Sequence, residues 1–140
     1  CIAAVDLDGN ILWRIGRPDV RNFSAESKLP MGVIDINNNG KDEVVVSRNF
    51  KIMILEGSTG RVLRSVSTSK YREGGGYVEG PETFFERVLG DQIVFADVRG
   101  LGRPRDIIFK DRYNNLWVYT DTLDVLWSYS GKLTHHLYMI

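Results

Sequence analysis

Cysteine is nearly absent from this sequence, and no sign of charge is in excess. Cys1 is the single cysteine, so a disulfide bond within the chain is excluded. The 18 basic residues balance 18 acidic ones, which removes any global argument for a nucleic-acid partner or an anionic membrane surface. No apolar run approaches the length of roughly 20 residues with which a helix crosses a bilayer.

What is present is the composition of a globular domain. The 140 residues are 43% hydrophobic and 26% charged, which suffices for one domain with a real core. An N-terminal cysteine is also how mature lipoproteins begin. Residues 2–6 nevertheless continue directly as a predicted strand, without a flexible tether, and no signal peptide is visible. We therefore expect this sequence to begin inside a domain.

The segment 35–46, with sequence DINNNGKDEVVV, carries the most informative pattern. It has oxygen-bearing side chains at positions 1, 3 and 5, a glycine at 6 and a carboxylate at 9, as in loops that surround a calcium ion. An EF-hand would have a glutamate at position 12 between two helices. Val46 stands there instead, inside a β-branched run that predicts a strand. The predicted ligands are the side chains of Asp35, Asn37, Asn39 and Glu43 and the carbonyl group of Lys41.

This calcium loop has an alternative interpretation. Only Asp35 and Glu43 are charged ligands, so we expect a modest affinity, and Asp42 either points away or replaces Glu43 as the carboxylate ligand. The alternative is a turn without metal, held by hydrogen bonds from side chains to the backbone. If calcium binds, its expected role is structural, because it would hold the flanking strands in register.

A repeat of about 62 residues organises the sequence. Residues 97–102 match residues 35–40 at an offset of 62, and an apolar run follows each segment. A hairpin with a polar turn also recurs three times, at 3–13, 54–64 and 118–127. Glycine, asparagine and aspartate supply the positive-φ positions that such turns need.

Each repeat reads as four short antiparallel strands, so the predicted fold is all-β, with the four-stranded blades of a β-propeller. The predicted strands are 32–36, 44–48, 51–56 and 61–66 in one blade, and 92–97, 106–110, 115–120 and 124–129 in the next. The predicted segments are the end of one blade at 1–16, blades at 30–66 and 91–130, an inserted loop at 67–90, and the start of another blade at 135–140. That amounts to about two and a half blades, whereas closure takes at least about four, so we expect part of a larger propeller. It would need its remaining blades or self-association.

The inserted loop at 67–90 is rich in glycine. Within it, 82–88 predicts one or two helical turns. A loop this long is uncommon in a compact domain, and it is either a plain insertion or a substrate lid.

The second loop departs from the calcium pattern. Arg99 stands at position 3, Leu101 at position 5, and the carboxylate Asp106 comes one residue late. A guanidinium group has no acceptor and cannot bind a cation, so we predict that this loop has lost its metal. Arg99 or Arg105 would then pair with Asp97 or Asp106; the alternative is that Arg99 faces solvent.

Basic residues gather between positions 99 and 112, followed by aromatic ones. Arginine pairs with carboxylates and aromatic rings offer flat apolar surface, which suits contact with an acidic sugar. The alternative is a solvated rim and packing between blades. The residues of this weaker candidate site are Arg103, Arg105, Arg112, Tyr113 and Trp117.

The remaining candidates favour structural roles. Trp13, Trp117 and Trp127 recur in register with predicted strands, which indicates packing between blades rather than ligand stacking. His135 and His136 could serve as a general base or a metal ligand, but nothing at ligand spacing accompanies them. No nucleophile elbow, phosphate loop or dinucleotide fingerprint occurs, so no catalytic residue is assigned.

The calcium loop and its strand resemble FG-GAP or VCBS repeats, which occur in integrin α-chain propellers and many secreted bacterial propellers. The hairpins AVDLDGNILW (4–13) and LEGSTGRVL (55–63) also resemble quinoprotein-type propeller repeats. The run GRPRDIIFKDRYNNLW (102–117) is similar to secreted bacterial propellers related to the rhamnogalacturonan lyases.

The resemblance implies a secreted, periplasmic or cell-surface protein with calcium (Ca2+) as its cofactor, which recognises or processes a polysaccharide. A lyase of this kind would act by β-elimination at uronic acid residues, with calcium bridging the substrate carboxylate. The rival expectation is a non-enzymatic adhesion or scaffold propeller, as in integrin-like proteins. A quinone-dependent dehydrogenase is disfavoured, because the matching hairpins are structural and no cofactor residues are apparent.

Overall fold

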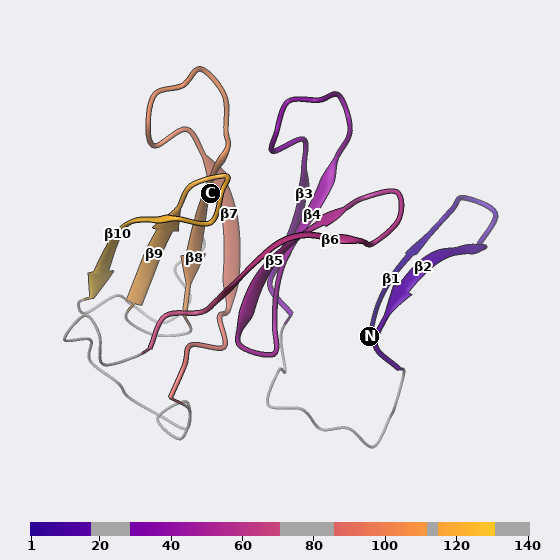
Figure 1. The fold of residues 1–140 in the computed structure, drawn as a ribbon, viewed down its shortest axis with the longest axis horizontal. Coiled ribbons are helices and arrows are strands. Elements are labelled where there is room, and N and C mark those ends of the chain that lie inside the picture. The colour runs from indigo at the N-terminus through magenta and orange to yellow at the C-terminus, as the bar shows by residue number, and fades with distance from the viewer. Residues whose placement is uncertain (18–28, 71–85, 112–114, 131–140) are drawn as a thin grey trace.

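Three antiparallel β-sheets make up the described part of the protein. The computed structural model describes residues 1–17, 29–70, 86–111 and 115–130, and no helix occurs among them. Figure 1 shows a two-stranded hairpin, a central four-stranded sheet and a second four-stranded sheet side by side. The predicted all-β class is therefore confirmed.

Within each sheet, strands that follow one another along the chain are paired. The hairpin contains β1 (Ile2–Val5) and β2 (Ile11–Ile15). The central sheet contains β3 (Met31–Ile34), β4 (Glu43–Arg48), β5 (Lys51–Glu56) and β6 (Val62–Ser67). The second sheet contains β7 (Gln92–Ala96), β8 (Asp106–Lys110), β9 (Asn115–Tyr119) and β10 (Val125–Ser130). The eight strands of the two larger sheets begin and end within two residues of their predicted positions.

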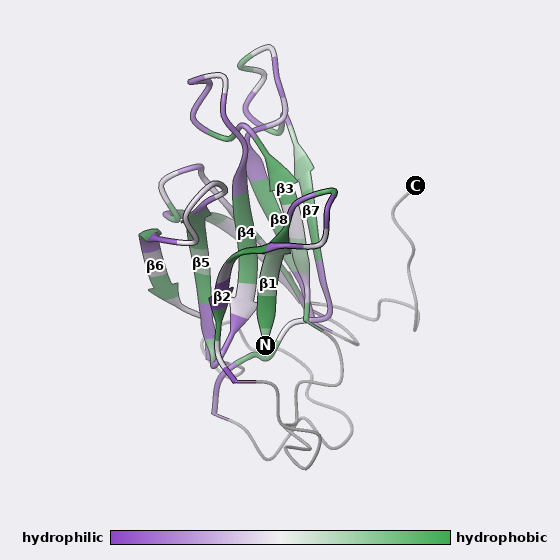
Figure 2. Ribbon diagram, turned by 90° about the vertical axis from the view of Figure 1, so that its right-hand side faces the viewer, coloured by the Kyte–Doolittle hydropathy of each residue, from purple (hydrophilic) through white to green (hydrophobic). Residues whose placement is uncertain are grey.

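The central sheet is covered on both faces at β4. Side chains of a strand alternate between faces. Val44 and Val46 pack with Ile2 of the hairpin, whereas Val45 belongs to the core shared with the second sheet. The continuous β-branched run at the start of β4 is the composition expected of a strand buried on both sides. Figure 2 shows hydrophobic residues along these strands and hydrophilic ones in the loops.

The two four-stranded sheets meet along β3 and β7. Gly32 of β3 makes this approach possible, because a Cβ atom there would lie 2.6 Å from the ring of Phe95 on β7. The shared core takes residues from both sheets and from the segment before β7. Its buried members are Ile36, Val45, Ile52, Ile54, Val88, Ile107, Phe109, Trp117, Tyr119 and Leu123.

The end of the inserted loop is extended rather than helical. Arg87 forms a β-bridge with Lys70, and the Val88 N–H donates to the carbonyl of Ser69 at 3.1 Å. The predicted helical turns at 82–88 are therefore wrong for residues 86–88, because burial of Val88 in the core fixes this segment beside the chain at 69–70. Residues 82–85 and the predicted strand at 135–140, with His135 and His136, lie outside the described residues.

The described residues also contain no helix with the length and apolar character of a membrane span.

Candidate metal-binding loop

Two long loops project from the same end of the two larger sheets. Residues 35–42 connect β3 to β4, and residues 97–105 connect β7 to β8. Figures 1 and 2 show both loops at this end, opposite the turn between β4 and β5. The two loops hold equivalent places in their sheets. In strand register, Glu43 stands opposite the last residue of β3, and Asp106 stands opposite the last residue of β7.

The aspartate at position 1 closes the first loop. The Asp35 carboxylate accepts the N–H groups of Asn39 at 3.0 Å and Gly40 at 2.9 Å. Asn38 and Gly40 have positive φ values of 62° and 81°, which curl the backbone around this carboxylate. Desolvation raises the pKa of Asp35, but the backbone N–H donors and the charge of Arg103 outweigh it and leave that pKa below its ordinary value.

The carboxylate at position 9 is buried at the base of the same loop. Glu43 is 2% exposed, and its oxygens accept the N–H of Ile36 at 3.1 Å and the side-chain amide of Asn37 at 2.8 Å. Both donors are neutral. None of the ion pairs among the described residues involves Glu43. A buried carboxylate with neutral donors alone is costly unless a cation compensates its charge.

The second loop repeats the closure of the first. The Asp97 carboxylate accepts the N–H groups of Leu101 at 2.6 Å and Gly102 at 2.7 Å, at the same positions 5 and 6. Leu101 has no oxygen in its side chain, yet the loop closes in the same way. The hydrogen bonds of Asp35 and Asp97 therefore account for the loop shape and do not by themselves indicate an ion.

In the second loop an arginine stands where the first loop has the predicted ligand Asn37. The Arg99 N–H donates to Asp106 at 3.0 Å, and its Nε donates to the other carboxylate oxygen at 2.7 Å. Asp106 is fully buried. Arg99 and Asn37 both stand at position 3, and each donates to the carboxylate that begins the next strand. The predicted pairing of Arg99 with Asp106 is confirmed, and Arg99 does not simply face solvent.

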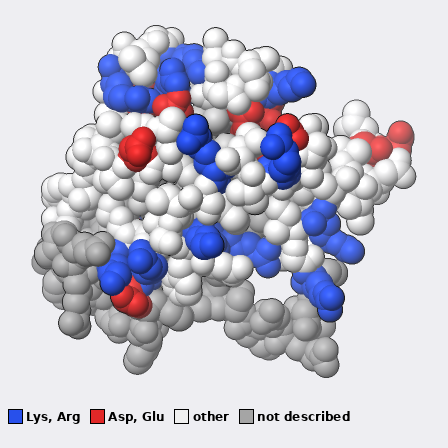
Figure 3. Space-filling view, viewed as in Figure 1, with Lys and Arg blue, Asp and Glu red and all other residues white. Residues whose placement is uncertain are grey.

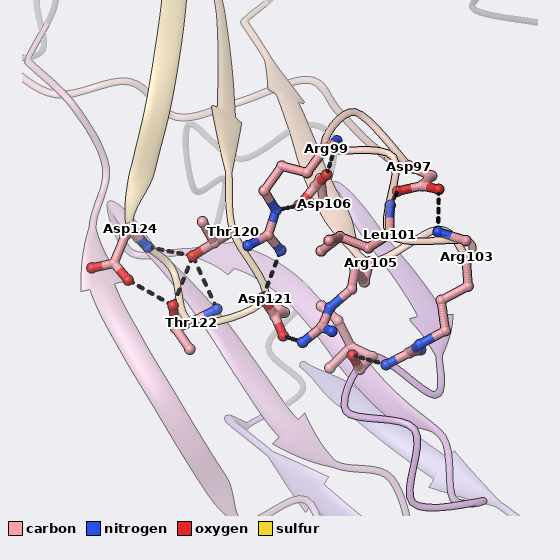
Figure 4. Close-up of polar contacts among 12 residues, drawn as sticks. Asp97, Arg99, Leu101, Arg103, Arg105, Asp106, Thr120, Asp121, Thr122 and Asp124 are labelled. Carbon is pink, nitrogen blue, oxygen red and sulfur yellow. Dashed lines mark hydrogen bonds and ion pairs between the residues drawn. The ribbon is translucent and has the colours of Figure 1, made fainter.

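Asp121, in the turn between β9 and β10, extends this network. It accepts the Arg99 guanidinium at 2.8 Å and forms an ion pair with Arg105 (Figure 4). In the central sheet, the turn after β5 is joined to the loop before β4 by a backbone hydrogen bond instead, from the Gly57 N–H to the carbonyl of Asp42 at 3.2 Å. Sequence reasoning missed Asp121. Its position, six residues after the first residue of β9 as Gly57 is six residues after the first residue of β5, is the signal that aligns it.

The donor set of the first loop fits a hard cation with one rearrangement. Asp35, Asn39 and Glu43 have side-chain oxygens with free lone pairs, and Lys41 has its carbonyl group. Asn37 turns its Nδ2 toward Glu43, so it offers its Oδ1 only after the amide group rotates. Among the described residues no group of three or more His, Cys, Asp or Glu side chains could hold a metal. The predicted set has only two carboxylates and depends on amide and carbonyl oxygens.

A cavity of about 610 Å³ borders this loop. It lies between the hairpin and the central sheet, with apolar walls that include Trp13, Val33 and Leu63. Four of the five predicted ligand residues line it: Asn37, Asn39, Lys41 and Glu43. The loop is therefore open to solvent and to ions from the cavity side.

The three described residues of the weaker sugar site have other partners in this structure. Trp117 is buried in the core beside Phe109, which favours packing over ligand stacking. Arg103 donates to backbone carbonyls of the first loop, and Arg105 pairs with Asp121. Arg112 and Tyr113 lie outside the described residues. Figure 3 shows basic and acidic side chains interspersed at the loop end rather than a patch of one sign.

Tryptophans at equivalent places in two repeats differ in their surroundings. The Trp13 indole N–H on β2 donates to the carbonyl of Gly57 at 2.7 Å. Its ring covers Gly60, where a Cβ atom would lie 2.6 Å from the indole. Trp127 on β10 is 46% exposed. The hairpin therefore packs on the turn of the next sheet through Trp13.

Comparison of the chain with protein-family models, with curated proteins and with solved structures gives no match.

Proposed function

We propose that the loop 35–43 binds calcium and that this ion stabilises a β-propeller of which the three sheets are successive blades. Asp35, Asn39 and Glu43 would hold the ion through their side chains and Lys41 through its carbonyl, with Asn37 joining once its amide rotates. The ion would supply positive charge at the junction of β3 and β4.

The contrast between Glu43 and Asp106 carries this proposal. Both carboxylates are buried at the first position of the second strand of their sheet. Asp106 has the Arg99 guanidinium against it, whereas Glu43 receives only neutral donors among the described residues. A divalent ion in the first loop would compensate the buried negative charge of Glu43, as the Arg99 guanidinium compensates that of Asp106. The oxygen-bearing side chains at positions 3 and 5 are present only where arginine is absent.

The propeller assignment rests on the repeated four-stranded sheets and on Trp13. Each larger sheet is a meander whose first strand lies against the neighbouring sheet and whose last strand is the most exposed. The side chain of Trp13 joins the outer strand of one unit to the turn of the next. Side-by-side meanders linked in this way are what propeller blades require.

Thermal unfolding with calcium and with a chelator tests the ion. We expect calcium to raise the melting temperature of the 140-residue chain, and Asp35→Ala to abolish that increment. At a calcium concentration about 100-fold above Kd the ion contributes about 2.7 kcal/mol by mass action. Asp97→Ala is the matched control, because it removes the same loop-closing bonds where no ligands follow. A calcium increment that survives in Asp35→Ala would contradict the assignment.

The resemblance to secreted polysaccharide-active propellers adds a proposed role in polysaccharide recognition or processing. A lyase would release unsaturated products from pectic substrates, detectable by ultraviolet absorption. An adhesion or scaffold propeller would bind a glycan or protein and leave it intact. Incubation with acidic polysaccharides, followed by absorbance and by binding measurements, distinguishes the two.

A further inference from the structure

Arg103 reaches from the second loop to the backbone of the first. Its Nη1 donates to the carbonyl of Asp35 at 2.7 Å, and its Nη2 donates to the carbonyl of Ile36 at 3.0 Å. These residues are 68 and 67 positions away in the sequence. The guanidinium fork therefore holds two successive carbonyl groups of the first loop, a geometry that suits arginine and that lysine cannot reproduce.

The peptide group between Asp35 and Ile36 links Arg103 to Glu43. Its carbonyl accepts from Arg103, and its N–H donates to the buried Glu43 carboxylate at 3.1 Å. A charged donor at the carbonyl polarises the peptide and strengthens the bond made by its N–H. The same residue pair carries the Asp35 carboxylate, so one clamp fixes the backbone that supports both Asp35 and Glu43, the two carboxylates of the predicted ligand set.

The second loop is itself braced on either side of Arg103. Gly102 donates its N–H to Asp97, and Arg105 is paired with Asp121, as Figure 4 shows. The Arg105 N–H also donates to the carbonyl of Ala96 at 3.2 Å. Arg103 thus extends from a loop that its own ion pairs and hydrogen bonds hold in shape.

We propose that Arg103 is a positioning residue for the cation loop, through which the second sheet sets the geometry of Glu43 and Asp35 and thereby the calcium affinity of the first loop. The second loop, with arginine where the first has ligands, serves as a support for its neighbour. The claim that Arg103 sets the calcium affinity of the first loop rests on the proposed function. The coupling of Arg103 to Glu43 does not, because it runs through hydrogen bonds between groups of the protein itself.

A double-mutant cycle without calcium tests the coupling. Arg103→Met and Glu43→Gln, alone and together, are compared by urea unfolding in the presence of a chelator. We expect the double variant to lose clearly less in unfolding midpoint than the sum of the single losses. Arg103→Met combined with Glu56→Gln is the control pair and should be additive, because no contact joins these two residues among the described ones. Additivity at Glu43 overturns the inference. If Arg103→Met does not fold, Arg103→Lys replaces it.

Calorimetric titration with calcium alone tests the effect on affinity. We expect Arg103→Met to raise the Kd at least about tenfold, as removal of residues that orient metal ligands does. Arg103→Lys keeps the positive charge but loses the two-pronged guanidinium geometry. Its Kd should lie between those of Arg103→Met and the wild type. Arg61→Met removes a basic group from the cavity that borders the first loop and should leave the Kd unchanged.

The outcomes separate the two proposals. A lower Kd in Arg103→Met would mean that charge repulsion outweighs positioning, and it overturns the inference. A purely structural role would lower the melting temperature equally with and without calcium and leave the Kd unchanged, which also overturns it. If the wild type does not bind calcium, the proposed function fails; the cycle in chelator then decides whether Arg103 positions Glu43.

Discussion

At the scale of single residues, the buried carboxylates that begin β4 and β8 have different surroundings. Asp106 has a guanidinium group against it, whereas Glu43 accepts only neutral donors among the described residues. If the first loop binds calcium as proposed, the arginine at position 3 of the second loop takes the place of an exchangeable ion. Its charge is covalently attached and is present at every calcium concentration.

Removal of Arg99 should be strongly destabilising. Arg99→Met leaves Asp106 buried with backbone donors only, and loss of one partner of a buried pair costs about 3–5 kcal/mol. Since the Arg99 side chain is 30% exposed, we expect the lower end of that range, measured by urea unfolding. The double variant Arg99→Met/Asp106→Asn should recover part of the loss. No recovery would mean that Arg99 acts through packing and not through its charge.

At the scale of elements, the hairpin β1–β2 depends on one aromatic contact with the central sheet. The Trp13 ring covers Gly60 while its N–H bonds to Gly57, so both glycines of the turn between β5 and β6 serve this contact. Gly57 has a second constraint, because a Cβ atom there would lie 2.3 Å from the carbonyl oxygen of Asp42. The glycines of this turn are thus required by close approach between elements.

Trp13→Phe tests this docking. It keeps an aromatic ring and removes the indole N–H, so we expect a loss of about 1 kcal/mol in the free energy of unfolding, measured in urea. Trp127→Phe changes the equivalent residue of the second sheet, which is half exposed, and should stay within about 0.5 kcal/mol of the wild type. Equal losses in the two variants would contradict the docking role of Trp13.

At the scale of the whole molecule, the three sheets form a row, and their strands differ in how deeply they are buried. The central sheet packs against the hairpin on one face and against the second sheet on the other. The outer strands β2, β6 and β10 expose most of their side chains, including Ile11, Val62 and Val125. Stability should therefore fall from the central sheet outward.

Hydrogen exchange measured by NMR checks this gradient. We expect the amides of Val45 and Val46 on β4 to exchange most slowly, because both faces of that strand are buried. Amides of β2 and β10 should exchange faster, through local opening that leaves β4 intact. Uniform exchange across all three sheets would show that the molecule opens only as one cooperative unit.

The sequence by itself determined the strands of the two larger sheets. Alternating and β-branched residues between polar turns located these eight strands, because such signals act within a few residues. For Arg99 the sequence excluded a role as metal ligand but left open whether it pairs with a carboxylate or faces solvent; the structure decided for Asp106. The segment at 86–88 was mispredicted because burial of Val88, a long-range effect, overrode its local helical pattern.

Only the tertiary structure decided which loop residues meet. Arg103 was a candidate sugar-binding residue from the sequence, yet its guanidinium holds carbonyl groups 67 and 68 residues away. Trp117 was a candidate for ligand stacking, and packing of the two sheets buried it. Asp121 became the shared partner of Arg99 and Arg105 only because the turn after β9 lies beside the loop after β7. Such contacts depend on how the sheets pack, and sequence spacing does not encode the distance between side chains on different sheets.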